Sequence, residues 1–244
     1  MIWIARWVSH LVIFLVLCYT KEKKFVRRLE ILQNKVMEAK SATQTFELLL
    51  ANGVYRAFDH IGDFVLTHKE FNICVMENEN QEAVEKLLTQ KGDCGLVIGR
   101  DDRLQQEIVA QLPIGLWIYQ GHPYYECKEI SICMLKDQNL LSMNEHSRIY
   151  IDLVSACKSE HFIPNIRMFA TDGEALEGFC AAGVGLAISP YFFQEARKNL
   201  RFVPFSGGYT WDIYMSWIKE KSQNQGVKLM REWLKKERKS NEKI

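Results

Sequence analysis

Apolar and polar positions along this chain follow two periodicities, one typical of strands and one typical of helices. Segments of the two kinds alternate over most of the chain. Short apolar runs predict strands at residues 45–52, 71–77, 95–99, 114–119, 140–143, 167–169, 185–189 and 209–219. Helical spacing predicts helices at residues 55–66, 81–90, 147–160, 173–182 and 224–239. This alternation is typical of an α/β protein, and it predicts mostly parallel sheets with helices on both faces.

The most informative stretch is residues 162–190, FIPNIRMFATDGEALEGFCAAGVGLAISP. Its first part favours a strand, after which Thr171 is placed to cap a helix, with Glu174 reaching back to the cap. Gly183 is expected to end that helix, because a left-handed residue after a helix is best supplied by glycine. A short apolar strand then runs up to Pro190, so the stretch predicts a βαβ unit.

Composition narrows the class of protein. The chain has 244 residues, of which 48% are apolar, enough for one large domain or two small lobes. Its formal net charge is +1 with both signs interspersed, a poor profile for a complete DNA-binding protein. The seven cysteines are scattered, with no C-x-x-C motif and no nearby histidine. This pattern predicts that they are buried as small apolar side chains in a reducing compartment, and it argues against a disulfide or a metal site.

The amino-terminal segment allows two interpretations. Residues 2–19 are apolar apart from Arg6, Ser9 and His10, and a helix of this length would cover roughly 27 Å, marginal for a bilayer core. Lysines and arginines follow directly and oppose export, so the body is expected in the cytoplasm. Residues 1–19 are therefore either a membrane anchor or a displaced start of the chain.

Helical spacing continues at residues 20–44, where apolar residues recur at steps of three and four over about two heptads. The segment is either a dimerisation helix or a surface helix packed on its own domain.

Several pieces of the chain together resemble the effector-binding domain of LysR-type transcriptional regulators. They are the stretch 162–190, DCGLVIG at 93–99, GHP at 121–123 and ISICMLKDQNLLSM at 130–143, in the family's order. The resemblance covers residues 20–239. It implies a two-lobed α/β fold of the type 2 periplasmic-binding-protein kind at residues 45–240, preceded by a linker helix at 20–44. Lobe I would hold residues 45–119 and 211–240, and lobe II residues 120–210.

The resemblance implies a transcriptional regulator that binds a small effector and assembles as a homodimer or tetramer. YTKEKKF at residues 19–25 is similar to the end of the family's winged helix-turn-helix, and only nineteen residues precede Thr20. The DNA-binding head is thus expected to be absent from this chain, so DNA would be contacted only through a head not present here. The alternative is a membrane-tethered solute-binding protein of a transporter.

A cleft between two such lobes would collect helix N-termini, which favour anions, so a small carboxylate is the expected effector. Arg100 is the expected carboxylate partner, because guanidinium offers a bidentate fork. The loops after the strands supply the remaining candidates, for which capping or turn chemistry is the competing interpretation. The candidate effector-binding residues are Gly53, Val54, Tyr55, Arg100, Asn144, His146 and Thr171.

No enzyme motif is recognisable in the sequence. G-x-S-x-G, H-E-x-x-H and a Walker loop are all missing, and Gly183-Val184-Gly185 precedes a strand where a dinucleotide loop would precede a helix. We therefore expect no catalytic residues, no cofactor and no metal.

Overall fold

The computed structural model of the protein describes residues 44–58, 60–192 and 198–241. The chain divides into two compact units, residues 1–45 with 70–72 and residues 46–69 with 73–244. In the first unit only residues 44–45 and 70–72 are described, and all the other described residues belong to the second unit. The predicted amino-terminal segment and linker helix lie outside the described residues, except that Gln44 already belongs to a strand.

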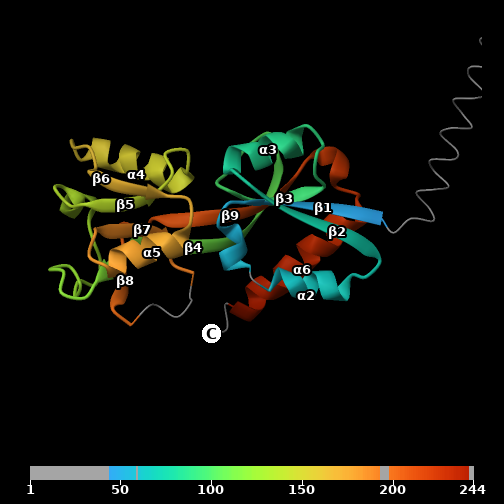
Figure 1. Ribbon diagram of the computed structural model, residues 1–244. Coiled ribbons are helices and arrows are strands. Elements are labelled where there is room, and N and C mark those ends of the chain that lie inside the picture. Colours follow the sequence, from blue (N-terminus) through green and yellow to red (C-terminus); the bar gives the residue numbers. More distant parts are fainter. Residues whose placement is uncertain (1–43, 59, 193–197, 242–244) are drawn as a thin grey trace, which may run out of the picture. The chain divides into compact units, whose positions relative to one another are not determined.

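Strands and helices alternate along the described chain, as expected for an α/β protein (Figure 1). The strands are β1 Gln44–Ala51, β2 Phe71–Asn78, β3 Cys94–Ile98, β4 Gln105–Tyr119, β5 Leu140–Met143, β6 Ile166–Ala170, β7 Leu186–Pro190, β8 Leu200–Pro204 and β9 Thr210–Trp217. The α-helices are α2 Ile61–Thr67, α3 Asn80–Leu88, α4 Arg148–Ser159, α5 Gly173–Ala181 and α6 Gln225–Asn241. The 3₁₀ helices are η1 Val54–Ala57, η2 Ile132–Leu135 and η3 Lys219–Lys221.

One sheet path, β2-β1-β3-β9-β4-β7-β5-β6, connects the strands, with β8 paired to β4. Strand β4 belongs to both parts of this path. Its segment up to Pro113 pairs with β9, and its segment from Ile114 pairs with β7, while β8 joins it from Gly115 onward. We call β2, β1, β3, β9 and the start of β4 the first half, and the end of β4 with β7, β8, β5 and β6 the second half (Figure 1).

The expectation of mostly parallel sheets is wrong, because the sheet is mixed. Pairs β1–β3, β5–β6 and β5–β7 are parallel, whereas β3–β9, β4–β9, β4–β7 and β4–β8 are antiparallel. The α/β class is nevertheless confirmed. Each of these antiparallel pairs involves β4 or β9, and β3 and β4, which are both antiparallel to the intervening β9, run in the same direction.

Each half has its own apolar core. In the first half, Leu49 and Val97 of the sheet are buried against Ala83, Val84 and Leu87 of α3. In the second half, the cluster is formed by Trp117, Leu141, Leu176, Cys180 and Ala187. Within the described part of the chain, no helix is both long and apolar enough to span a membrane.

The predicted βαβ unit is present as β6, α5 and β7, with β5 lying between its two strands in the sheet. The expected cap is corrected: Asp172, not Thr171, accepts hydrogen bonds from the backbone N–H groups of Glu174 and Ala175, both at 3.1 Å. Gly183 does end the helix, with φ of 77°. Its N–H donates to Cys180 O and that of Val184 to Phe179 O, the two bonds of a Schellman motif.

Two further differences concern element boundaries. The helix predicted at residues 55–66 is divided into η1 and α2, because Phe58 leaves the helical region with φ of −135° and ψ of 44°. The sequence does not predict strand β8, and β4 begins at Gln105, well before the expected position 114.

The described cysteines differ in burial. Cys74 and Cys133 are exposed, whereas Cys180 is fully buried and its Sγ lies 3.0 Å from Trp117 O. Burial raises the pKa of the Cys180 thiol to about 11, so little nucleophilic thiolate is present at neutral pH.

We expect iodoacetamide to alkylate Cys74 and Cys133 in the native protein and to spare Cys180, as read by peptide mass spectrometry. Unfolding in urea should abolish the difference, and equally fast native labelling of Cys180 would contradict it.

Candidate functional site

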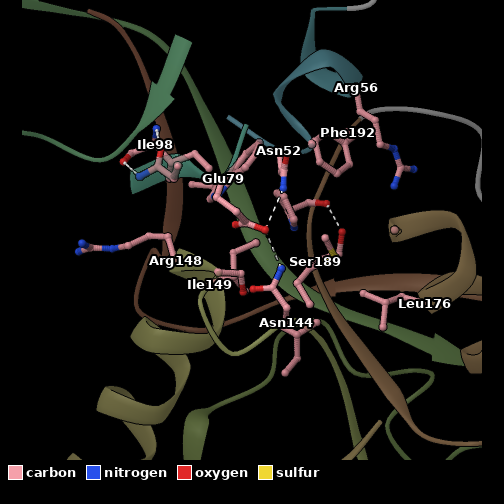
Figure 2. Close-up of a pocket in the computed structure, with 18 residues that line it drawn as sticks. Asn52, Arg56, Glu79, Ile98, Asn144, Arg148, Ile149, Leu176, Ser189 and Phe192 are labelled. Carbon is pink, nitrogen blue, oxygen red and sulfur yellow. Dashed lines mark hydrogen bonds between the residues drawn. The ribbon is translucent and has the colours of Figure 1, made fainter. Parts of the chain in front are cut away.

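A pocket of about 70 Å³ lies where the two halves of the sheet meet (Figure 2). The first half contributes Asn52, Gly53, Arg56, Glu79, Asn80, Ile98 and Trp211 to its lining. The second half contributes Met143, Asn144, Ser147, Arg148, Ile149, Gly173, Leu176, Ile188, Ser189, Pro190 and Phe192. In α/β sheets, ligands bind at the carboxyl ends of strands, and β1, β3 and β5 all end at this pocket.

The turn after β1 forms one wall of the pocket. Gly53 adopts φ of 81°, a left-handed conformation that suits glycine. Its backbone N–H donates to Glu77 Oε1 at 2.9 Å, and Asn52 N donates to Asn78 O at 2.8 Å. These two bonds to the end of β2 hold the Asn52 side chain toward the pocket.

The loop between β5 and α4 forms the opposite wall. Ser147 caps α4 by accepting from the N–H of Tyr150 at 3.3 Å. Asn144 Oδ1 accepts from the N–H of His146 at 3.0 Å, which orders the loop. The Nδ2 group of Asn144 is thereby turned toward the first half, so this residue combines turn chemistry with a place in the pocket.

Glu79 joins the two walls. Its Oε1 accepts hydrogen bonds from Asn52 Nδ2 at 3.0 Å and from Asn144 Nδ2 at 3.1 Å. Figure 2 shows the carboxylate between the two amides. One carboxylate oxygen therefore connects side chains that come from different halves of the sheet.

An ion pair makes a second connection between the halves. Arg56 Nη2, from η1, lies 3.0 Å from Glu177 Oε1 on α5, and the side chains are 25% and 11% exposed, respectively. The guanidinium also lies over the ring of Phe192, with Cζ 4.6 Å from the ring centroid. Gly173 leaves the space that Arg56 needs, because a Cβ atom there would collide with Nη1.

The charged groups of the lining are Arg56, Arg148 and Glu79. Arg148 Nε pairs with Asp152 at 2.9 Å one turn further along α4, and the Arg148 side chain is 53% exposed. The lining thus carries two guanidinium groups, each paired with a carboxylate of the protein, and two amides that donate to Glu79.

The serine hydroxyls of the lining take part in local contacts. No histidine or cysteine is among the described residues that form it, Ser147 caps a helix, and Ser189 Oγ donates to Pro190 O at 2.8 Å. Across the ranges that the structure describes, no group of three or more histidine, cysteine, aspartate or glutamate side chains could hold a metal ion.

The structure brings two of the seven predicted site residues, Gly53 and Asn144, to the pocket. Val54 is fully buried, and Tyr55 is 49% exposed outside the lining. His146 and Thr171 are likewise exposed and do not line it. A role of these residues in effector binding stays a prediction.

Arg100 lies in a loop with its own ion pairs. Its Nε bonds Asp102 Oδ1 at 3.0 Å, its side chain is 77% exposed, and it does not line the pocket. Next to it, hydrogen bonds from Arg103 hold the pKa of the Asp101 carboxyl below its usual value. The loop charges are satisfied locally, and Arg56 and Arg148 are the arginines that the fold brings to the pocket.

The pocket residues not predicted from the sequence include Glu79, Arg148, Phe192 and Trp211. Glu79 lies in the polar break NENQ between β2 and α3, which marks a loop but does not reveal its partners. These partners lie 27 and 65 residues away along the chain.

Comparison with known proteins points to one family. Residues 46–239 match the family described as "LysR substrate binding domain". No curated protein matches the chain.

Solved structures resemble the fold at low sequence identity. The effector-binding domain of BenM with its effector benzoate has a TM-score of 0.69 at 17% identity, covering 79% of this chain and 91% of that one. The regulatory domain of CcmR from Synechocystis PCC6803, in complex with 2-PG, has a TM-score of 0.70 at 14% identity, covering 78% and 95%. The effector-binding domain of QuiR in complex with shikimate has a TM-score of 0.68 at 14% identity, covering 80% and 97%.

Proposed function

Because the chain belongs to the LysR substrate-binding domain family over residues 46–239, we propose that its pocket binds the effector that controls a LysR-type transcriptional regulator. The observation that carries this proposal is the origin of the lining, which comes from both halves of the sheet. A molecule bound there would contact both halves at once.

Effector binding would act on contacts that already join the halves. The Glu79–Asn144 hydrogen bond and the Arg56–Glu177 ion pair both border the pocket. A ligand that competes with either contact favours one arrangement of the halves over another, and this differential affinity is what regulation requires. A dimer or tetramer would convert such a change into altered spacing of DNA-binding heads.

We propose a small carboxylate as the effector class. Arg56 and Arg148 supply positive charge, and the Asn52 and Asn144 amides supply neutral donors. The structural neighbours were solved with benzoate and with shikimate, both small organic acids. Arg100, the partner expected from the sequence, lies outside the lining, so we place the carboxylate at the Asn52 and Asn144 amides, with Arg56 and Arg148 as the arginines of the same lining.

We propose that the protein acts in the cytoplasm as a regulator without catalytic activity. Lysines and arginines follow the apolar residues 2–19 and oppose export of the body. The solute-binding alternative is not favoured, because the matched family is the substrate-binding domain of LysR proteins.

The proposal is tested by ligand binding to the full chain. We expect benzoate or shikimate at millimolar concentration to raise the melting temperature, and benzamide, the uncharged analogue of benzoate, to have little effect. Replacing Arg148 by glutamine should weaken carboxylate binding on the order of tenfold, since a charged hydrogen-bond donor is lost. Arg167→Gln, which removes an exposed charge outside the pocket in the same half, is the matched control.

Isothermal titration calorimetry gives the affinities. Equal loss of affinity in Arg148→Gln and Arg167→Gln would contradict the placement of the carboxylate. If uncharged compounds bind and no small organic acid does, the carboxylate class of the effector is wrong, whereas effector binding by the pocket still stands.

A further inference from the structure

Glu79 is the only acidic residue among the described residues that line the pocket. It occupies the residue before α3, where a side chain usually caps the helix, yet its carboxylate makes no cap hydrogen bond. The side chain is directed instead to the two amides of Asn52 and Asn144 (Figure 2). An acidic group therefore lies where the proposed function expects an anionic ligand.

The two amide contacts have the form of a carboxylate-binding site. Side-chain NH₂ groups from opposite walls converge on one oxygen at 3.0 and 3.1 Å, within the normal range for such bonds. A ligand carboxylate placed at the same point would receive the same two bonds. The site is thus already filled by a group of the protein itself.

The size of the cavity agrees with this occupancy. The pocket has a volume of about 70 Å³, whereas pockets for small molecules commonly measure roughly 300 to 1,000 Å³. An aromatic or cyclic acid needs more space than remains beside Glu79. Such a ligand requires Glu79 to leave, and the walls that Glu79 joins then separate.

We propose that Glu79 is a built-in stand-in for the effector carboxylate, which holds the two halves together without ligand and is displaced when a carboxylate effector binds. This inference rests on the proposed function, because it assigns the regulation of the same pocket. Displacement lowers the apparent affinity for carboxylates, since the amides must first be released from Glu79. It also gives the protein a closed form that does not depend on the effector.

The test uses the full chain and the variants Glu79→Ala and Glu79→Gln. Alanine removes the carboxylate, and glutamine keeps the shape and one acceptor oxygen but loses the charge. The control is Glu82→Ala, which removes a carboxylate from the same end of α3, where Glu82 pairs with Lys86 on the surface. Hydrogen–deuterium exchange without ligand reports whether Glu79 holds the two walls together. Calorimetry with benzoate and benzamide reports whether Glu79 occupies the position of the ligand carboxylate.

We expect faster exchange at residues 143–149 in Glu79→Ala, an intermediate rate in Glu79→Gln and no change in Glu82→Ala. We expect the affinity for benzoate to rise on the order of tenfold in Glu79→Ala, and that for benzamide, which gains space but carries no charge, to rise less.

Two results would overturn the inference. The first is unchanged exchange in both Glu79 variants, which would show that the carboxylate does not hold the halves together. The second is faster exchange without any gain in carboxylate affinity, which would show that Glu79 does not occupy the carboxylate position. In either case, wild-type protein that still binds benzoate would leave the proposed function standing.

Discussion

Replacing Gly115 with alanine is expected to lower the free energy of unfolding by about 3 kcal/mol, the upper end for overpacking. Gly115 lies in β4 between β7, where it pairs with Ser189, and β8, where it pairs with Pro204. A Cβ atom here would collide with the carbonyl oxygen of Val203 and lie 2.7 Å from the Cα of Pro204. Backbone atoms on a paired strand cannot move away without breaking the ladder.

Urea denaturation of the full chain measures this effect. The matched control is Gly62→Ala in α2, where an added Cβ meets nothing within 4 Å, so the variant should be neutral or slightly more stable. Equal stability of the two variants would show that β8 adapts to a side chain at position 115.

Replacing Arg56 with methionine is expected to destabilise the protein by about 2 kcal/mol. Loss of the guanidinium leaves the Glu177 carboxylate largely buried without its partner, a change that costs about 3 to 5 kcal/mol for a fully buried pair. We expect less, because the Arg56 side chain is 25% exposed and water reaches it. The contact with the Phe192 ring is lost in the same variant.

The double variant Arg56→Met, Glu177→Met distinguishes the stability lost through the unpaired Glu177 charge from the stability lost through the packing of Arg56. It should recover most of the stability, because the buried Glu177 charge is removed together with its partner. Arg100→Met, which removes an arginine from the exposed pair with Asp102, should change the stability by no more than about 0.5 kcal/mol. Failure of the double variant to recover would place the cost in the packing of Arg56 and not in Glu177.

Local patterns predicted most elements of the fold, and the misses have identifiable causes. Gly183 ends α5 as the sequence predicted, whereas the cap at the other end is Asp172 and not the expected Thr171. In contrast, β4 passes through Pro113, a residue that argues against a strand interior. Strand β8 has five residues and, among the described strands, pairs only with β4, so it owes its conformation to a partner about 85 residues away in the chain.

Loops that follow strands gave part of the lining from the sequence, although most of the candidates taken from such loops lie outside it. Gly53 and Asn144 each follow a strand and line the pocket. The roles of Glu79 and Arg56 depend on contacts with Asn144 and Glu177, 65 and 121 residues away. Such pairings follow from the register of the whole sheet, which no local pattern contains.

The position of β9 has a consequence for the order in which the protein folds during synthesis. Strand β9 lies between β3 and β4 in the sheet, although it is the last described strand of the chain. The first half therefore cannot close its sheet until residues 210–217 have left the ribosome. All the strands of the second half have been made by then, so the later-encoded half has its full set of strands available for pairing before the earlier one does.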